Sequence, residues 1–316
     1  FAEFFGPRRN PDIEISQHHK NIAAGMQDRL VEIVVEKLSE LQRETKMVNL
    51  CLSGGVALNC SMNGEIERSN LFQEIFVVPA AGDSGVSIGA AFEGYKSIAN
   101  GSLTVKKRHN FYLGYRIQNQ VVEETAKQYG YIPEELNGVT LADFAAQKLS
   151  EGFVIGIARN GAEFGPRALG NRSIVADPRS VQMRDHINHR VKFREGFRPF
   201  APAVLVEQQN EFFHMSYPSP HMLRGIPASS YGKRAIPAVV HTDGSARVQS
   251  VDKELNPEFW DLINAFASIT GVPVLLNTSL NVKGQPVVNT ERDAFIALDE
   301  MNLDYMIIGD FIFKKR

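Results

Sequence analysis

The apolar positions in the first hundred residues follow two different spacings. Between residues 22 and 44 they recur every three or four positions, opposite an acidic face, which predicts an amphipathic helix. Short apolar runs bounded by glycine or proline predict strands in MVNLCLSGG and EIFVVP, and helical spacing returns in ALNCSMNGEIERS and SIGAAFEGYKSIAN. This alternation of strands and helices predicts a layered α/β module.

The pattern is interrupted at GSLTVKKRHNFYLGYRIQ and then resumes, so we predict two domains, residues 1–108 and 109–316. Helices are expected at VVEETAKQYG, LADFAAQKLSEG, VQMRDHINHRV, PEFWDLINAFASI and ERDAFIALDEMN. Strands are expected at FVIGIAR, APAVLV, AIPAVVH, ARVQSV, VPVLLNT and YMIIGDFIFKK. The turn TDGS predicts a hairpin between AIPAVVH and ARVQSV, because Asp-Gly accepts positive φ angles. The second domain is therefore expected to be mixed α/β with some antiparallel pairing.

Composition narrows the class of protein. A chain of 316 residues is long enough for two domains, and no run of about eighteen apolar residues or secretory signal occurs. The two cysteines, Cys51 and Cys60, fit a reducing compartment, and we expect a cytoplasmic protein without membrane contact. A net charge of −2 gives no general attraction to nucleic acid. The chain begins FAEFFGPRR, so an upstream segment is expected to precede it.

Two glycine-containing turns in the first domain follow predicted strands and precede predicted helices. Gly54, Gly55 and Gly85 would let backbone N–H groups approach a phosphate closely. Tight strand-to-helix packing explains the same residues, and the two interpretations are about equally supported. Asp83 lies just ahead of a predicted helix, where it can cap the helix or bind a ligand or metal; spacing alone favours the cap.

A denser group of cations lies in the second domain. GAEFGPRALGNRS supplies Arg167 and Arg172, and VKFREGFRPFAP supplies Lys192, Arg194 and Arg198. Arginine binds phosphate or carboxylate with a planar pair of donors, and lysine adds a mobile charge. A solvated basic face is the alternative. Because phenylalanine, proline and leucine are interleaved with these cations, partial burial around an anion is the better interpretation.

Three weaker candidates remain in the second domain and near the N-terminus. Asn277, Ser279 and Asn281 follow the strand VPVLL and either orient a ligand or cap a turn. Arg247, in HTDGSARVQ, is largely explained by the predicted hairpin. The adjacent pair HHK is not spaced for a helical metal site, which favours surface or capping histidines. The chain also lacks HExxH, CxxC, GxSxG and Walker motifs.

Taken together, six segments resemble the carbamoyltransferases of the NodU and CmcH type, in the family's order and over nearly the whole chain. These segments are CLSGGVALNCSMN, VPAAGDSGVSIGAA, EFGPRALGNRSIVADPR, VKFREGFRPFAPAVL, HTDGSARVQSV and GVPVLLNTSLNVKGQPVV. The resemblance implies α/β folds: a partial ATPase-like domain of the actin and sugar-kinase kind, followed by a YrdC-like mixed α/β domain with a twisted open sheet. It also implies that the first half of the ATPase-like domain is absent from this sequence.

The same resemblance implies a two-step reaction. Carbamoyl phosphate and ATP would form carbamoyl adenylate in the YrdC-like domain, and the ATPase-like domain would pass the carbamoyl group to an acceptor hydroxyl. Matching motif positions assign seven residues to the adenylate site: Arg167, Arg172, Lys192, Arg198, Asn277, Ser279 and Asn281. They assign the nucleotide-contacting turn to Gly54, Gly55 and Asn59, and metal binding to Asp83.

ATP with Mg²⁺ is the implied cofactor, and iron is implied for the complete ATPase-like domain. The family's iron also needs two histidines from an HxxxH helix, and this sequence contains no such motif; HHKNIAAGMQ matches a later family helix. SLN and GQP stand where many relatives have SFN and GEP, which are conservative departures. Two alternatives stay open: an RNA-binding module, which the near-neutral charge disfavours, and a non-catalytic nucleotide-binding fragment. The acceptor is not readable from the sequence.

Overall fold

A computed structural model describes residues 2–10, 13–99, 101, 110–282 and 284–316. The helices and strands of the first module confirm the predicted alternation. They are α1 (Ala2–Phe5), α2 (Gln17–Thr45), β1 (Asn49–Leu52), the short helix η1 (Gly55–Leu58), α3 (Cys60–Arg68), β2 (Glu74–Val77), η2 (Asp83–Gly85) and α4 (Val86–Ile98). The predicted division between residues 108 and 109 lies outside the described residues.

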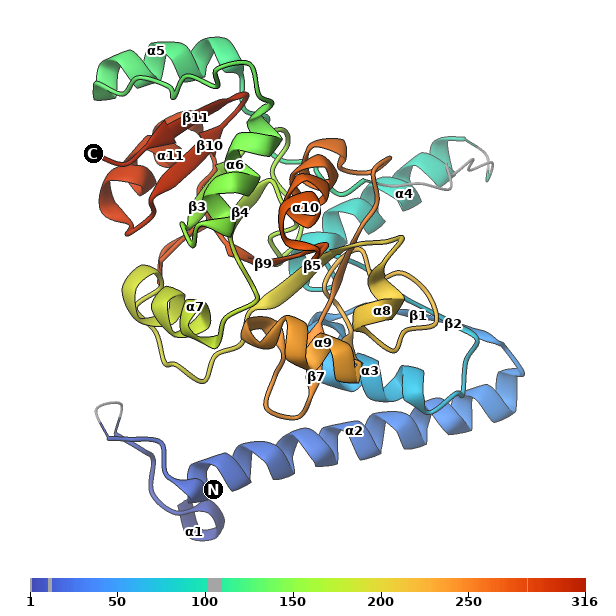
Figure 1. The fold of residues 1–316 in the computed structure, drawn as a ribbon. Coiled ribbons are helices and arrows are strands. Elements are labelled where there is room, and N and C mark those ends of the chain that lie inside the picture. Colours follow the sequence, from blue (N-terminus) through green and yellow to red (C-terminus); the bar gives the residue numbers. More distant parts are fainter. Residues whose placement is uncertain (1, 11–12, 100, 102–109, 283) are drawn as a thin grey trace.

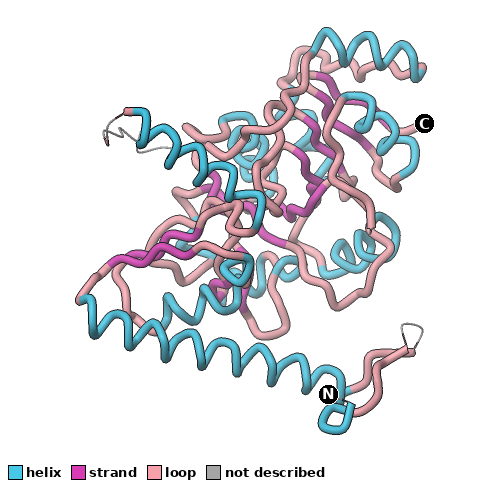
Figure 2. The backbone as a smooth tube through the Cα atoms, turned by 180° about the vertical axis from the view of Figure 1, so that it is seen from behind, coloured by secondary structure: helices cyan, strands magenta, loops and turns pink. Residues whose placement is uncertain are grey.

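The first module is built on a parallel pair of strands, β1 and β2, which α3 and α2 cover. Leu38, Leu50, Ile66 and Ile75 belong to its buried core. In both views α2 lies along one edge of the molecule, away from the large sheet (Figures 1 and 2). The helix begins with a capping box, in which His19 Nδ1 accepts from the Ser16 backbone N–H at 3.1 Å. This contact confirms the capping interpretation for His19, whereas the exposed His18 lies 3.0 Å from Phe5 O through its Nε2.

The second module contains the remaining helices and strands. They are α5 (Asn119–Tyr129), α6 (Leu141–Ser150), β3 (Ile155–Ala158), β4 (Arg172–Ala176), α7 (Val181–His186), the π-helical turn η3 (Ile187–Val191), β5 (Ala201–Leu205), α8 (Gln209–Phe212), β6 (Gly225–Pro227), α9 (Ser230–Ala235), η4 (Pro237–Val239), β7 (Ser245–Arg247), β8 (Gln249–Val251), α10 (Pro257–Thr270), β9 (Val274–Ser279), α11 (Glu291–Glu300), β10 (Tyr305–Ile308) and β11 (Phe311–Lys314).

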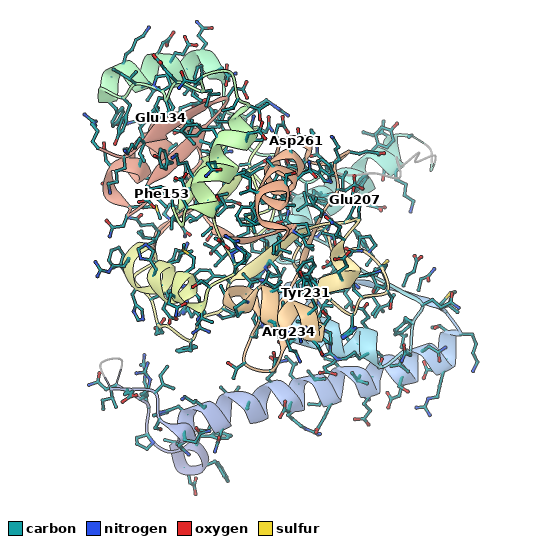
Figure 3. All side chains as sticks on the ribbon, in the orientation of Figure 1. Glu134, Phe153, Glu207, Tyr231, Arg234 and Asp261 are labelled. Carbon is teal, nitrogen blue, oxygen red and sulfur yellow. The ribbon has the colours of Figure 1, made fainter. Side chains whose placement is uncertain are left out.

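Seven of these strands form one sheet in the order β11-β10-β3-β4-β9-β5-β8. Some neighbouring strands of this sheet pair in parallel and others antiparallel, so the expected mixed α/β class is confirmed. Alternate strand residues enter two cores: Leu275 packs with α6 and α10, and Leu276 packs with α5 and α11. Phe153, labelled in Figure 3, precedes β3 and packs edge to face on Tyr305 of β10, with 5.6 Å between ring centroids.

Two predictions for this module were wrong in detail, and one strand was not predicted. AIPAVVH is not a strand: it contains the end of α9 and the turn η4. The TDGS turn does form, with the His241 N–H donating to Ser245 O at 2.7 Å, but β7 pairs with β6 instead of with AIPAVVH. The strand β4 lies at the centre of the sheet and was missed, since no strand was predicted there. In these segments, pairing with distant parts of the chain determined the secondary structure and overrode the local sequence pattern.

The two modules are in direct contact through α3. Asn63 Nδ2 donates to Leu223 O at 2.7 Å, and Arg68 Nη1 donates to Gly225 O at 3.1 Å. A Cβ on Gly64 would lie 2.2 Å from Gly225 O, so the backbones approach too closely for any side chain there. In the described part of the chain, none of the helices combines the length and apolar character that crossing a bilayer needs.

Candidate anion-binding site

The loop before β4 is held in shape by the Glu163 carboxylate. Its Oε1 accepts from three backbone N–H groups, those of Leu169 at 2.7 Å, Asn171 at 2.8 Å and Arg172 at 3.2 Å. Gly165 has a φ of 137°, and a Cβ there would lie 2.9 Å from Pro79 O of the first module. The conformation of the loop is therefore fixed by the hydrogen bonds to Glu163 and by close packing against the first module.

The loop before β4 places Arg167 at a cavity of about 260 Å³. Four arginines from three separate segments line it: Arg167, then Arg194 and Arg198, then Arg247 at the end of β7. The remaining lining residues are Pro166, Ala168, Pro199, Met222, Asn277, Thr278 and Ser279. Among the residues that the structure describes, none of those in this lining is acidic. The cavity therefore concentrates positive charge in a partly desolvated space, which suits a small, multiply charged anion.

The pKa values of the innermost arginines reflect this crowding. Burial first, and then the charges of Arg167 and Arg194, lower the pKa of Arg247 to about 10. Burial also lowers the pKa of Arg167. Among the described residues, neither of these two guanidinium groups has a carboxylate partner, and both Nε atoms are buried without a hydrogen-bond acceptor. A bound anion would supply the missing acceptors and relieve the repulsion.

The other two arginines are better supported by the protein. Arg194 Nε donates to Asn188 Oδ1 at 2.8 Å, and its guanidinium lies 4.7 Å from the centre of the Phe200 ring. Arg198 is exposed and forms an ion pair with Glu195 at 2.8 Å. Arg198 therefore lies at the rim of the cavity, and Arg167 and Arg247 present the less compensated charge.

Asn277 and Ser279 reach the cavity from within β9, and do not follow a strand as we had expected. Lys192 lies behind them and is almost fully buried. Its Nζ donates to Ser279 O at 2.7 Å, Asn281 O at 2.7 Å and Asn281 Oδ1 at 2.9 Å, and lies 3.3 Å from Ser279 Oγ. Lys192 does not line the arginine cavity, and its contacts fix the end of β9.

Lys192 gives a testable pH dependence. Burial, and secondly the charge of Arg194, lower its pKa from 10.5 to about 7, although the four surrounding oxygens favour the ammonium form. Between pH 7 and about 10 the unfolded chain keeps a proton that the folded chain releases, so stability rises with pH in this window. We expect the free energy of unfolding to gain about 2 kcal/mol from this group between pH 7 and pH 9.

The measurement is urea unfolding of the natural chain and of Lys192→Met at both pH values. Methionine leaves the oxygens without a donor and lowers stability at each pH, so the informative quantity is the change between the two. That change should be smaller in the variant by about 2 kcal/mol. Equal changes in both proteins would show that Lys192 does not release its proton in this range.

Arg172 is not in the cavity, contrary to our expectation. Only 1% of its surface is exposed, and its guanidinium donates to backbone carbonyls. They include Arg159 O and Tyr115 O, both at 2.8 Å, and Asn289 O at 3.0 Å. Because its donors are already engaged by the protein, Arg172 holds three chain segments together, and this geometry gives no support for a role in contacting a ligand.

A second and larger cavity of about 830 Å³ begins beside Asn281. Its lining is mainly apolar and includes Phe193, Val282, Val288 and Ile296. Ser279 borders the arginine cavity and Asn281 borders the larger one, and Lys192 binds both residues. The two spaces are thus neighbours separated by the end of β9 and its lysine.

The site residues predicted in the first module lie in a turn that touches the same loop. Gly54 has a φ of 93°, its N–H donates to Ala81 O at 2.8 Å, and both Gly54 and Gly55 are exposed. Asn59 caps α3, accepting from Met62 N at 3.0 Å. Arg167 Nη2 donates to Leu58 O at 3.2 Å, which joins this turn to the arginine cavity. A nucleotide role for the turn stays a prediction.

Asp83 is exposed at the start of η2. Among the residues that the structure describes, no three His, Cys, Asp or Glu side chains converge as metal ligands would. Asp83 therefore has no companion ligands there, and the residues present do not by themselves fit an iron site. Its assignment as a metal ligand stays a prediction.

The predicted set lacked Arg194 and Arg247. Arg194 had a visible signal, since it lies between Lys192 and Arg198 in one basic segment. Arg247 had only a weak one: it follows a turn that explained its neighbourhood, and nothing in the sequence shows that β6 and β7 carry it to the loop of Arg167.

Two family models match the chain. The one described as Carbamoyltransferase N-terminus matches residues 1–92, and the one described as Carbamoyltransferase C-terminus matches residues 146–315. The second covers more than half of the chain. The chain belongs to the carbamoyltransferase family, of the NodU and CmcH type. The arginine cavity lies wholly within the C-terminal match.

Curated relatives agree with this membership. Nodulation protein NolNO of Sinorhizobium fredii is 40% identical, covering 98% of this chain and 46% of that protein. Nodulation protein NolO of Bradyrhizobium diazoefficiens is 38% identical over 98% of this chain and 57% of its own length. The 3'-hydroxymethylcephem-O-carbamoyltransferase of Streptomyces clavuligerus is 33% identical over 95% and 55%. The chain thus spans about half the length of these relatives.

Proposed function

We propose that this chain carries the site at which carbamoyl phosphate and ATP form carbamoyl adenylate, and that the complete protein passes the carbamoyl group to an acceptor hydroxyl. One observation carries the proposal: in a chain of the carbamoyltransferase family, four guanidinium groups from three separate segments converge on one cavity, and none of its described lining residues is a carboxylate. Both proposed substrates are highly anionic and need such fixed cations.

The two cavities differ in size in a way that suits the two substrates. About 260 Å³ lies below the range of about 300–1,000 Å³ typical of drug-sized ligands, so the arginine cavity suits carbamoyl phosphate or the phosphates of a nucleotide. The apolar cavity of about 830 Å³ beside Asn281 has room for an adenosine group. We propose that ATP lies across the end of β9, with its phosphates toward Arg167 and Arg247.

Atom balance defines the reaction. Water cleaves the phosphate from carbamoyl phosphate and leaves carbamate; a carbamate oxygen then attacks the α-phosphorus of ATP, and pyrophosphate departs. Negative charge grows on the phosphoryl oxygens in the transition state, and prepositioned guanidinium donors stabilise it. Arg167 and Arg247 fit this role because their donors are the least engaged by the protein. Mg²⁺ usually accompanies ATP through its phosphates and one or two carboxylates.

The proposal is tested by supplying carbamoyl phosphate and Mg²⁺-ATP to the chain and measuring phosphate and pyrophosphate together. We expect both products in equal amounts, and neither ATP nor carbamoyl phosphate alone should release pyrophosphate. Arg167→Met should lower the rate by about 100-fold or more, as loss of a transition-state donor does. Arg43→Met, which changes an exposed arginine on α2, is the control and should keep the natural rate.

The same experiment separates the alternatives. ATP binding without pyrophosphate release, also in the full-length protein, would favour a nucleotide-binding role without catalysis. The relative named as a 3'-hydroxymethylcephem-O-carbamoyltransferase motivates a hydroxyl acceptor, and its name does not transfer that acceptor to this chain. The acceptor step is proposed for the complete protein.

A further inference from the structure

One residue that lines the arginine cavity has a buried acceptor that no described residue satisfies. Asn277 is 1% exposed, lies in β9 and lines the cavity. Its Nδ2 donates to Gln249 Oε1 at 2.9 Å and to Ala168 O at 3.2 Å, but its Oδ1 has no donor among the described residues. A buried polar atom without a partner costs about 1–3 kcal/mol, so natural structures rarely keep one without a use.

The orientation of this amide is fixed by its neighbours. An asparagine oxygen and nitrogen can be exchanged by a half-turn of the side chain, and only the hydrogen-bond network decides between them. Leu169 O can only accept, so Gln249 must direct Nε2 toward it, at 2.8 Å, and present Oε1 to Asn277. Ala168 O also can only accept. A reversed Asn277 would place its oxygen against two acceptors, so the unpaired atom is an oxygen.

The unpaired oxygen sets a second requirement for the ligand, in addition to negative charge. The four arginines favour an anion, and Asn277 Oδ1 can be satisfied by an N–H or O–H donor on the same ligand. Carbamoyl phosphate has both, because its amino group donates and its phosphate is anionic. In acetyl phosphate a methyl group of similar size takes the place of the amino group and cannot donate.

We propose that Asn277 Oδ1 accepts a hydrogen bond from the amino group of the carbamoyl substrate and so selects carbamoyl over acyl phosphates. Gln249 is the positioning residue: it is buried and holds the Asn277 amide with the oxygen free. This inference rests on the proposed function, since it takes the arginine cavity as the carbamoyl phosphate site.

Calorimetric titration of carbamoyl phosphate and of acetyl phosphate into the natural chain tests the proposal. An unpaired buried acceptor should weaken acetyl phosphate binding about 10- to 100-fold relative to carbamoyl phosphate. In Asn277→Leu the ratio should fall to nearly 1, mainly through loss of carbamoyl phosphate affinity. In Gln249→Met the Asn277 amide is present but less constrained, and the ratio should fall by a smaller factor. Circular dichroism checks that each variant is folded.

Asn63→Leu is the matched control, because Asn63 is equally buried and does not line the cavity. Its selectivity ratio should equal that of the natural chain. Equal binding of both phosphates by the natural chain would overturn this inference and leave the proposed anion site intact. A ratio that neither Asn277→Leu nor Gln249→Met alters would also overturn it. Binding of neither phosphate would reject the proposed function and the inference together.

Discussion

Replacing Arg247 with methionine should lower the affinity for carbamoyl phosphate by about 30-fold or more, without reducing the stability of the free protein. The loss of affinity follows because truncating one member of a buried charge pair costs about 2–5 kcal/mol. Stability should be preserved because Arg247 is desolvated beside Arg167 and Arg194, and no described residue supplies a carboxylate to it. Removing it relieves repulsion in the free protein.

Two measurements together test this prediction. Calorimetry gives the affinity, and thermal unfolding without ligand gives the stability, with Arg43→Met as the control for a lost surface charge. A residue that only supports the fold shows the opposite combination, with a lower melting temperature and unchanged affinity. That result for Arg247→Met would contradict its placement in the binding site.

Arg172→Met should have the opposite effect, a loss of at least about 3 kcal/mol of unfolding free energy. Methionine removes donors from backbone carbonyls of β3's flanking loop and of the segments at Tyr115 and Asn289, and these oxygens stay buried. Each unsatisfied buried acceptor costs about 1–3 kcal/mol. Several together should therefore lower the unfolding free energy by more than an ordinary surface substitution does.

Urea unfolding measures this loss, and Arg159→Met is the matched control from the same region. Arg159 pairs with the exposed Asp310 at 2.9 Å, and such pairs contribute about 0–1 kcal/mol. A small effect of Arg172→Met, close to that of the control, would show that its carbonyl contacts do not matter for the fold. A large loss would show that Arg172 stabilises the fold, although its position in the sequence matches an anion-binding position of the family.

Most helices and several strands were readable from the sequence because their periodicity is local. The helix α2 and strands such as β5 follow the expected hydrophobic spacing. The strand β4 was not readable, since its short apolar run SIVA follows glycine-rich segments typical of loops, and its place at the sheet centre depends on pairing with distant β3 and β9. Non-local pairing leaves little trace in a single sequence.

The site was predictable only where several cations share one segment. Arg167 and Arg198 were expected at a common cavity and line it. Arg172 has the same local setting as Arg167 in sequence, and only the backbone carbonyls around it distinguish the two roles. Arg247 comes from a remote strand, and the unpaired oxygen of Asn277 is a property of packed neighbours. Neither could be inferred from residue type.

A crystal structure of the chain with carbamoyl phosphate would show directly whether the arginine cavity binds the substrate. We expect the phosphate group in this cavity, within hydrogen-bond distance of the guanidinium groups of Arg167 and Arg247. Density for the ligand elsewhere, with these two side chains unchanged and without contact to it, would show that the cavity is not the binding site.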